Sequence, residues 1–163
     1  MGDASNRVGI IGVGLLGSAL GQRLAGQGWE VLGYDPAVPE LDGLTMCGSA
    51  VELADRCDTL LLSLPTSAIA AEVVGALGQT VTRRHCFIDT ITGEPNEMEA
   101  LGQALAERGA AYLEANVAGS SKLARHGAAV LFLGGAAETI NRCEALLETL
   151  ATIRFHVGTV GAA

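Results

Sequence analysis

The sequence predicts an α/β fold in which a doubly wound, mostly parallel sheet is covered by helices on both faces, in three layers. Short apolar runs rich in Val, Ile and Leu alternate with longer segments of helical period, as in successive β-α-β units. Residues 60–62 and 130–133 are apolar throughout, which is typical of strands buried on both faces. A length of 163 residues suits one domain with a sizeable core, so we expect residues 1–163 to form a single domain.

Each element is placed by its apolar pattern. Seven strands are predicted, near residues 7–12, 30–34, 59–64, 85–89, 111–117, 129–133 and 153–157. Three amphipathic helices are predicted by stripes at helical spacing: Leu16, Leu20 and Leu24; Met98, Leu101 and Leu105, opening after Pro95; and Ile140, Cys143, Leu146, Leu147 and Leu150 in one helix. We interpret these stripes as core, because such faces normally pack against a sheet.

Composition and charge exclude several classes of protein. Ten basic residues against eighteen acidic ones give a net charge of −8, which opposes binding to nucleic acid or to an anionic membrane. A chain with 49% apolar and 17% charged residues must fold rather than stay disordered.

The four cysteines form no C-x-x-C pair and are expected to be reduced core thiols. The apolar run 8–20 is interrupted by glycines and is too short to span a membrane, so we expect a cytoplasmic protein.

A phosphate-binding turn is predicted where the first strand meets the first helix. Residues 12–17 read Gly12-Val13-Gly14-Leu15-Leu16-Gly17, the pattern G-x-G-x-x-G. In a dinucleotide-binding (Rossmann-type) fold the first glycine permits the tight turn, the second admits the pyrophosphate and the third lets the helix pack closely. The free N–H groups of the helix then bind the anion. In a glycine-rich chain the pattern alone is equally compatible with a purely structural turn.

The end of the second strand strengthens the interpretation and predicts the cofactor. Tyr34 and Asp35 follow the apolar run of that strand, where the fold places a carboxylate against the adenosine ribose. Asp before proline is also a common turn opener, so the argument rests on the combination of strand, glycines, helix, strand and acid. A carboxylate with no Lys or Arg between Tyr34 and Arg56 repels a 2′-phosphate. We therefore predict NAD in preference to NADP.

The sequence resembles the β-hydroxyacid dehydrogenases, which include 3-hydroxyisobutyrate dehydrogenase, tartronate semialdehyde reductase and 6-phosphogluconate dehydrogenase. The resemblance spans essentially the whole chain. It is carried by residues 9–17 with Leu24 and Gly28, by 57–65, by Ile88-Asp89-Thr90-Ile91-Thr92-Gly93-Glu94-Pro95, and by Glu114-Ala115-Asn116-Val117-Ala118-Gly119-Ser120. The last two segments are similar to the family's D-x-S-T-x-x-P strand end and its D-A-P-V-S-G-G substrate loop.

The resemblance implies roles for particular residues. Leu64, Pro65 and Thr92 would contact the nicotinamide end of the cofactor. The substrate would lie against Asn116, Val117, Ala118, Gly119 and Ser120. Two departures make this region less polar than in the family: Ile91 stands where the family has serine, and Ala118 lacks the first hydroxyl of the Ser-Gly-Gly that binds the substrate carboxylate. A carboxylate left without a donor costs about 1–3 kcal/mol, so the substrate need not be a simple hydroxy acid.

The family's general acid–base lysine has no counterpart before Ala163. The resemblance places it about four residues further on, and we therefore expect no catalytic residue in this chain and little activity from it alone. Lys122, the only lysine, is interpreted as a solvated surface residue. His85, His126 and His156 lack metal-ligand spacing, and no metal is predicted. The resemblance also places the family's second, helical domain outside this chain, and an apolar face left uncovered in this way would favour self-association.

These observations favour the NAD-binding domain of a β-hydroxyacid dehydrogenase-like oxidoreductase. The resemblance implies hydride transfer between NAD and a small-molecule substrate, a 3-hydroxy acid or a related alcohol or semialdehyde. Two alternatives stay open: a non-catalytic dinucleotide-binding or assembly module, and an imine or ketone reductase that tolerates a less polar pocket. No nucleic-acid or membrane partner is expected, and a homo-oligomer is the expected form of any self-association.

Overall fold

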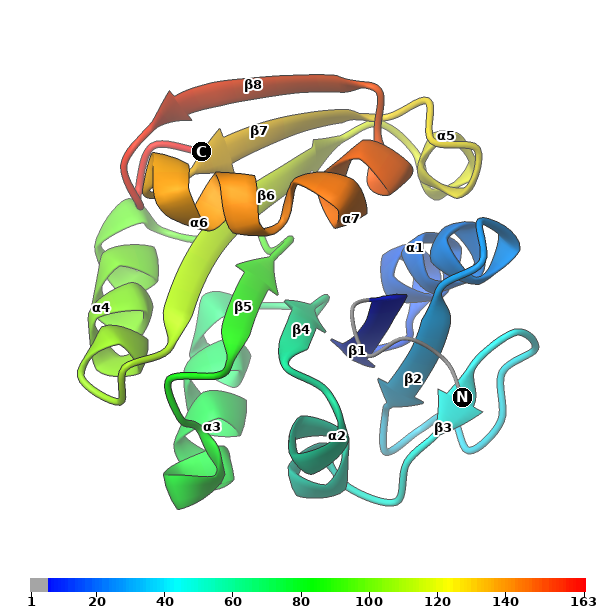
Figure 1. Ribbon diagram of the computed structural model, residues 1–163, viewed down its shortest axis with the longest axis horizontal. Helices are drawn as coiled ribbons and strands as arrows, with labels where there is room; N and C mark the ends of the chain where they lie inside the picture. The colour runs from blue at the N-terminus through cyan, green and yellow to red at the C-terminus, as the bar shows by residue number, and fades with distance from the viewer. Residues whose placement is uncertain (1–5) are drawn as a thin grey trace.

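One eight-stranded sheet runs through the molecule (Figure 1). The computed structural model describes residues 6–163. The strands are β1 (Arg7–Ile11), β2 (Glu30–Tyr34), β3 (Thr45–Met46), β4 (Thr59–Leu62), β5 (Cys86–Asp89), β6 (Ala111–Ala118), β7 (Val130–Gly134) and β8 (Ile153–Gly158). Their order is β3-β2-β1-β4-β5-β6-β7-β8, and neighbours are parallel except β6 and β7, which are antiparallel. The predicted doubly wound, mostly parallel α/β fold is confirmed.

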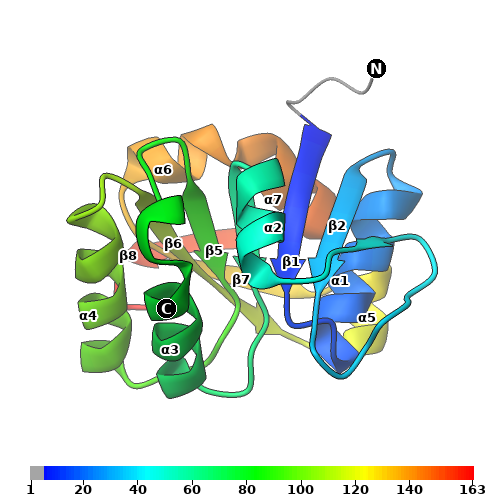
Figure 2. The same ribbon diagram turned by 90° about the horizontal axis from the view of Figure 1, so that it is seen from below.

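Helices cover the sheet on both sides, giving three layers (Figure 2). They are α1 (Leu15–Gly26), α2 (Ala50–Arg56), α3 (Ser67–Leu77), the 3-10 turn η2 (Gly78–Thr80), α4 (Pro95–Ala106), α5 (Ser121–Arg125), α6 (Ala137–Arg142) and α7 (Glu144–Leu150). Buried side chains of α1, α5, α6 and α7 form one core cluster with the sheet, and those of α2, α3 and α4 form the other. Among residues 6–163, no helix combines the length and apolarity needed to cross a membrane.

The sheet is fully covered at its centre and only half covered at one edge. Leu60, Leu61 and Leu62 of β4 are inaccessible to solvent, so burial on both faces is confirmed there. The same expectation was wrong for residues 130–133, because Phe132 of β7 is 36% exposed. It stacks on Phe155 of β8 with ring centroids 5.8 Å apart. On β7 and β8 helices pack against one face only, and the opposite face exposes its apolar side chains.

Two local predictions need correction. The apolar stripe from Ile140 to Leu150 belongs to two helices, because Cys143 ends α6 and precedes α7. Its N–H is shared between the carbonyls of Thr139 and Ile140, a three-centre bond typical of a helix end. The stripe stays in phase across the break, so the spacing could not reveal it. Strand β3 was not predicted, since two residues carry no period.

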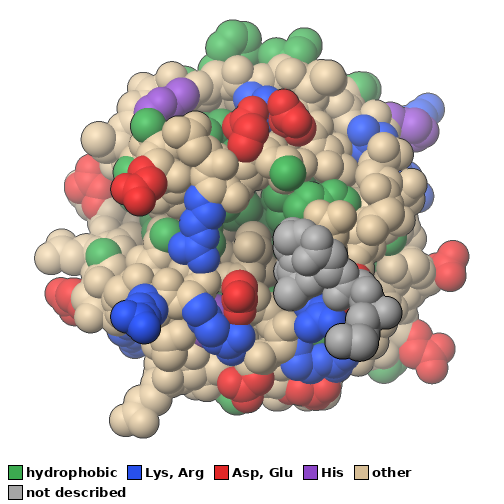
Figure 3. Space-filling view, in the orientation of Figure 1, with side chains coloured by type: hydrophobic (Ala, Val, Ile, Leu, Met, Phe, Trp, Pro, Cys, Tyr) green, Lys and Arg blue, Asp and Glu red, His purple; other side chains and the backbone are tan. Residues whose placement is uncertain are grey.

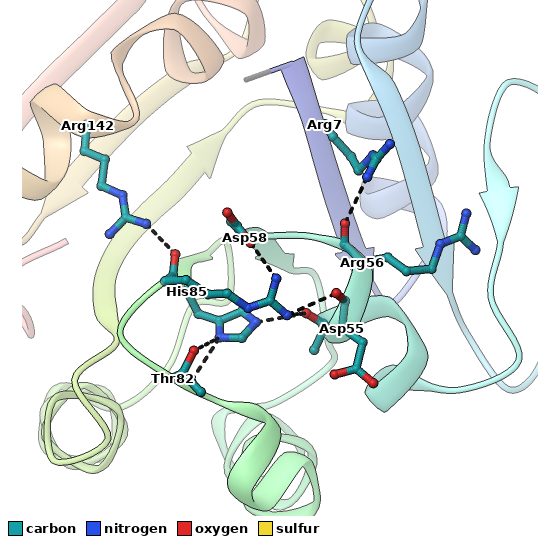
Figure 4. Close-up of polar contacts among 9 residues, drawn as sticks. Arg7, Asp55, Arg56, Asp58, Thr82, His85 and Arg142 are labelled. Carbon is teal, nitrogen blue, oxygen red and sulfur yellow. Dashed lines mark hydrogen bonds and ion pairs between the residues drawn. The ribbon is translucent and has the colours of Figure 1, made fainter. Parts of the chain in front are cut away.

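At the amino ends of the central strands, the free carbonyls of α2 are bound by side chains from the chain before β5 (Figure 4). The Arg84 guanidinium donates to the Ala54 and Asp55 carbonyls at 2.9 and 3.0 Å and to the Asp58 carboxylate at 2.7 Å. Buried His85 accepts the Thr82 N–H at Nδ1 and contacts the Ala54 oxygen through Nε2 at 2.9 Å. His85 therefore links the Thr82 N–H to the Ala54 carbonyl and closes the end of the helix.

Charge on the face seen in Figure 3 is mixed. Lys and Arg side chains alternate with Asp and Glu across its lower half. Ion pairs join Arg7 to Glu30 at 2.8 Å and Arg84 to Asp58 at 2.7 Å. Because the basic groups are interrupted by acids, this area does not form the continuous positive surface that binds a phosphate backbone.

Candidate functional site

The glycine turn lies between the end of β1 and the start of α1, and its first glycine is fixed by the backbone of two other strands. The Gly12 N–H donates to the Tyr34 carbonyl at 2.9 Å. Gly12 has a φ of +91°, and a Cβ there would lie 2.2 Å from the Ser63 carbonyl oxygen. Only glycine fits this conformation and this approach. The turn is therefore pressed against the chain that follows β4.

The other two glycines of the motif differ sharply in their surroundings. A Cβ on Gly17 would lie 2.0 Å from the Gly12 carbonyl oxygen, so this glycine lets α1 pack on the turn. A Cβ on Gly14 would meet no atom within 4 Å. The first and third glycines thus serve the fold, whereas the second borders open space. This is the division of roles predicted for a turn that a ligand approaches.

The start of α1 faces that space with unpaired backbone donors. Gly14 is the N-cap and provides no side-chain cap, and the first turn contains no acidic residue. The first N–H groups of a helix have no partner within it, and they form the positive end of the helix dipole. An anion can therefore bind here without a neighbouring lysine.

Asp35 is held against the turn immediately after β2. Its Oδ2 accepts the Val13 N–H at 3.1 Å and its Oδ1 accepts the Ala37 N–H at 2.9 Å. Both bonds fix the carboxylate, and each oxygen retains a lone pair for a further donor. The predicted acid and the predicted glycine turn are therefore brought together.

A cavity of about 450 Å³ opens at the carboxyl edge of the sheet between these groups. It is lined by Gly12, Gly14, Leu15, Leu16, Asp35, Ser63, Leu64, Pro65, Thr90, Ile91 and Thr92. Eight of the predicted cofactor residues are in this lining. Val13, Gly17 and Tyr34 are not, but each contacts a residue that is: Val13 contacts Asp35, and Gly17 and Tyr34 contact Gly12. Ser63 and Thr90 were not predicted, although each directly follows a buried strand that ends at this edge. Leu15 stands at the surface, 79% exposed.

The loop after β5 is shaped by a buried carboxylate. Asp89 accepts the Ile91 N–H at 2.9 Å and the Tyr112 hydroxyl at 2.8 Å. Burial raises the pKa of Asp89 to about 6, although both hydrogen bonds act in the opposite direction. The Thr90 hydroxyl donates to the Leu62 carbonyl at 2.8 Å. These bonds fix the backbone that presents residues 90–92 to the cavity.

The predicted substrate residues lie beside the cavity rather than in its lining. Strand β6 continues past the end of β5, which pairs with it only as far as Asp89 and Glu114. The Thr92 hydroxyl donates to the Asn116 side-chain oxygen at 3.2 Å, which links the two regions. Val117, Ala118 and Gly119 follow, and the Ser120 hydroxyl caps α5 by accepting the Leu123 N–H at 3.2 Å.

Glu114 ties the last residues of the chain to β6. It is 2% exposed, and its carboxylate accepts the Gly161 N–H at 2.6 Å. Burial raises its pKa, against the effect of backbone N–H groups from residues 161–163.

Lys122 lies apart from the cavity, exposed on α5 beside Arg125 and His126. Within residues 6–163 no cluster of His, Cys, Asp and Glu suited to a metal ion is found.

Comparison with known proteins gives a family and a fold. The family described as the NAD binding domain of 6-phosphogluconate dehydrogenase matches residues 7–159. Mouse mitochondrial 3-hydroxyisobutyrate dehydrogenase is 29% identical, over 94% of this chain and 48% of that protein. The Mycobacterium tuberculosis 3-hydroxyisobutyrate dehydrogenase structure with L-serine superposes with a TM-score of 0.91 and 25% identity, covering 96% of this chain and 56% of that one.

An imine reductase shares the fold as well. The Myxococcus stipitatus V8 variant in complex with NAD+ has a TM-score of 0.90 at 19% identity, over 97% of this chain and 57% of the reductase. The chain spans about half the length of the relatives it matches.

Proposed function

The chain belongs to the family of NAD-binding domains found in 6-phosphogluconate dehydrogenase, and on that premise we propose that it binds NAD in the cavity beside Gly14. It is the nucleotide-binding part of a β-hydroxyacid dehydrogenase-like oxidoreductase. The observation that carries the proposal is the contrast between Gly12 and Gly17, which are closed in by backbone, and Gly14, which faces open space at a helix start. We also propose that residues 1–163 fold as one domain.

The cavity residues suit the parts of a dinucleotide. The pyrophosphate would lie on the N–H groups of residues 14–16. Asp35 would accept hydrogen bonds from the adenosine ribose, and Leu64, Pro65 and Thr92 would contact the nicotinamide. When bound, the nicotinamide supplies or accepts a hydride. The protein's part is to hold its ring at the carboxyl edge of the sheet, where Asp89 fixes the loop that carries Thr92.

We propose that NAD is preferred to NADP. The Asp35 carboxylate is fixed beside the turn by Val13 and Ala37. A 2′-phosphate at the ribose would meet this negative charge, and no Lys or Arg lies between Tyr34 and Arg56 to offset it. A ribose with a free diol would instead donate to the carboxylate.

The proposed reaction is hydride transfer between NAD and a small 3-hydroxy acid or a related alcohol or semialdehyde, with the substrate beside Asn116, Val117, Ala118, Gly119 and Ser120. One observation favours an imine or ketone reductase as the second candidate: Ile91, an apolar residue, lines the cavity next to Thr92. We further propose that residues 1–163 alone do not turn over a 3-hydroxy acid, because the resemblance places the family's acid–base lysine beyond Ala163.

Titration with NADH and NADPH, followed by nicotinamide fluorescence, tests the cofactor assignment. NADH should bind more tightly, and Asp35→Ala should narrow the difference between the two cofactors. Asp42→Ala is the matched control, since it removes an exposed acid further along the same loop and should leave the preference unchanged. Equal binding of NADH and NADPH by the unaltered chain would exclude the role given to Asp35. No binding of either would exclude the function.

Self-association and location are further parts of the proposal. Phe132, Ile153, Phe155 and Val157 are between 36% and 53% exposed on the uncovered face of β7 and β8, and such a surface favours a homo-oligomer. Phe155→Ser should then lower the mass measured by analytical ultracentrifugation, and an unchanged mass would contradict it.

A cytoplasmic location is proposed from the reduced thiols, whereas the mouse relative is mitochondrial. Cell fractionation tests it.

A further inference from the structure

Two cysteines far apart in the sequence meet in the core. Cys86 begins β5, and Cys143 lies at the junction of α6 and α7. Their sulfur atoms are 3.3 Å apart, and both residues are free thiols. A disulfide bond is about 2.05 Å long, so the sulfurs need to approach by a little over ~1 Å. We propose that Cys86 and Cys143 form a dithiol site that a hydroperoxide oxidises to an intramolecular disulfide.

The surroundings allow this approach on one side of the pair. Cys86 is in a central strand, hydrogen-bonded through its N–H to the Asp58 carbonyl at 2.8 Å. Cys143 is at the junction between helices of six and seven residues, where its N–H is shared between the Thr139 and Ile140 carbonyls and its carbonyl accepts the Leu147 N–H at 3.0 Å. A small shift of this junction, which joins two short helices, would close the distance while β5 stays in place. Of the two thiols, Cys143 is the less deeply buried, because it is 5% exposed and Cys86 is inaccessible to solvent.

The two thiols are also chemically different. The hydrogen bond between the two sulfurs lowers the pKa of Cys143 against the effect of burial, and the positive charge of Arg142 acts in the same direction as the hydrogen bond. The pKa of Cys86 is raised by that same hydrogen bond and by burial. Arg142 is kept close by donating to the Arg84 carbonyl at 2.5 Å. Thiolates are the nucleophilic form of cysteine, so Cys143 is the attacking residue and Cys86 the resolving one.

The reaction balances with a hydroperoxide as the oxidant. The Cys143 thiolate attacks the O–O bond of ROOH, which gives a sulfenic acid and, with one proton, ROH. The Cys86 sulfur then attacks the sulfenic sulfur, and the S–S bond forms as water leaves with the thiol proton. Two thiols lose two electrons in total and one peroxide bond is reduced. The new bond would join the strand that leads to the cavity loop to the helical layer behind it. This site does not depend on the proposed function.

Peptide mapping of the folded chain tests the proposal. After treatment with hydrogen peroxide, the protein is unfolded, alkylated and digested. We expect two of the four thiols to become unreactive, with a cross-link between the Cys86 and Cys143 peptides that dithiothreitol reverses. The melting temperature should rise on oxidation, because the cross-link restricts the unfolded chain, and return on reduction.

Matched variants make the result specific. Cys47→Ser should retain the cross-link, although Cys47 is more exposed than Cys143, at 8% against 5%. Cys143→Ser should abolish it and leave Cys86 open to alkylation after unfolding. Cys143→Ala, checked by circular dichroism, serves if the serine variant does not fold. The proposal is overturned if Cys86 and Cys143 both remain alkylatable at a peroxide dose that oxidises Cys47, or if the cross-link forms only in urea.

Discussion

Replacing Gly14 by alanine separates ligand binding from folding at the glycine turn. The residue has φ −67° and extended ψ, and a Cβ there would meet no atom within 4 Å. Because alanine adopts this conformation, the change should alter stability by no more than about 1 kcal/mol, in the stabilising direction. The added methyl group would project into the space where the pyrophosphate is proposed to approach the backbone. A charge-assisted hydrogen bond lost in this way costs about 1.5–3 kcal/mol, which corresponds to roughly 10- to 150-fold weaker NADH binding.

Gly17→Ala should behave in the opposite way. Alanine in a helix gains up to about 1 kcal/mol over glycine, but here its Cβ would lie 2.0 Å from the Gly12 carbonyl oxygen. The Gly12 carbonyl and the Ser63 Cβ, at 3.2 Å, leave the added methyl group little room, and overpacking costs typically ~1–3 kcal/mol or more. We expect a net loss of about 2 kcal/mol, which lowers the melting temperature of a chain of this size by roughly 4–8 °C.

Thermal unfolding and NADH titration of both variants provide the assay. Gly14→Ala should melt at or slightly above the temperature of the unaltered chain and bind NADH poorly. Gly17→Ala should melt earlier. If Gly14→Ala binds NADH as tightly as the unaltered chain, the open space beside it is not the pyrophosphate site. If Gly17→Ala melts no earlier than Gly14→Ala, the close approach of α1 to the turn is not a structural constraint.

Two further predictions concern buried polar groups. Burial raises the pKa of Asp89 from 3.8 to about 6, so the native state binds its proton more firmly and stability is lost as the pH rises through that window. Asp89→Asn should flatten the dependence of the free energy of unfolding on pH, by at most about 3 kcal/mol. If the urea midpoint falls with pH equally steeply in the variant and in the unaltered chain, this prediction is contradicted. Arg84→Ala should cost about 1–2 kcal/mol by freeing the Ala54 carbonyl and Asp58. Arg83→Ala, at a neighbouring exposed residue, is the control in the same urea titration. If both variants lose the same free energy of unfolding, Arg84 does not cap α2.

Part of the candidate site could be predicted because its signal is local. The three glycines and Asp35 are specified by their order along one β-α-β unit. The structure places Gly12, Gly14 and Asp35 in the lining of one cavity, and Gly17 against the Gly12 carbonyl. Ser63 and Thr90 escaped prediction although they lie beside the predicted Leu64 and Thr92, since polar residues after strands are common and which of them face a cavity depends on how neighbouring strands end. The Thr92–Asn116 contact joins residues on neighbouring strands, and its existence depends on how far β6 extends beyond β5.

The sequence by itself determined the parallel α/β layers, the apolar faces of the main helices and the position of the glycine turn between β1 and α1. These follow from residue periodicity and backbone freedom, which act over a few neighbouring residues. Only the tertiary structure decided that Gly12 presses on Ser63, that Cys86 meets Cys143, and that one face of β7 and β8 stays uncovered. The reason is physical: burial and contact across the sheet are set by packing between distant segments, and local patterns carry no information about which segment will cover a given face.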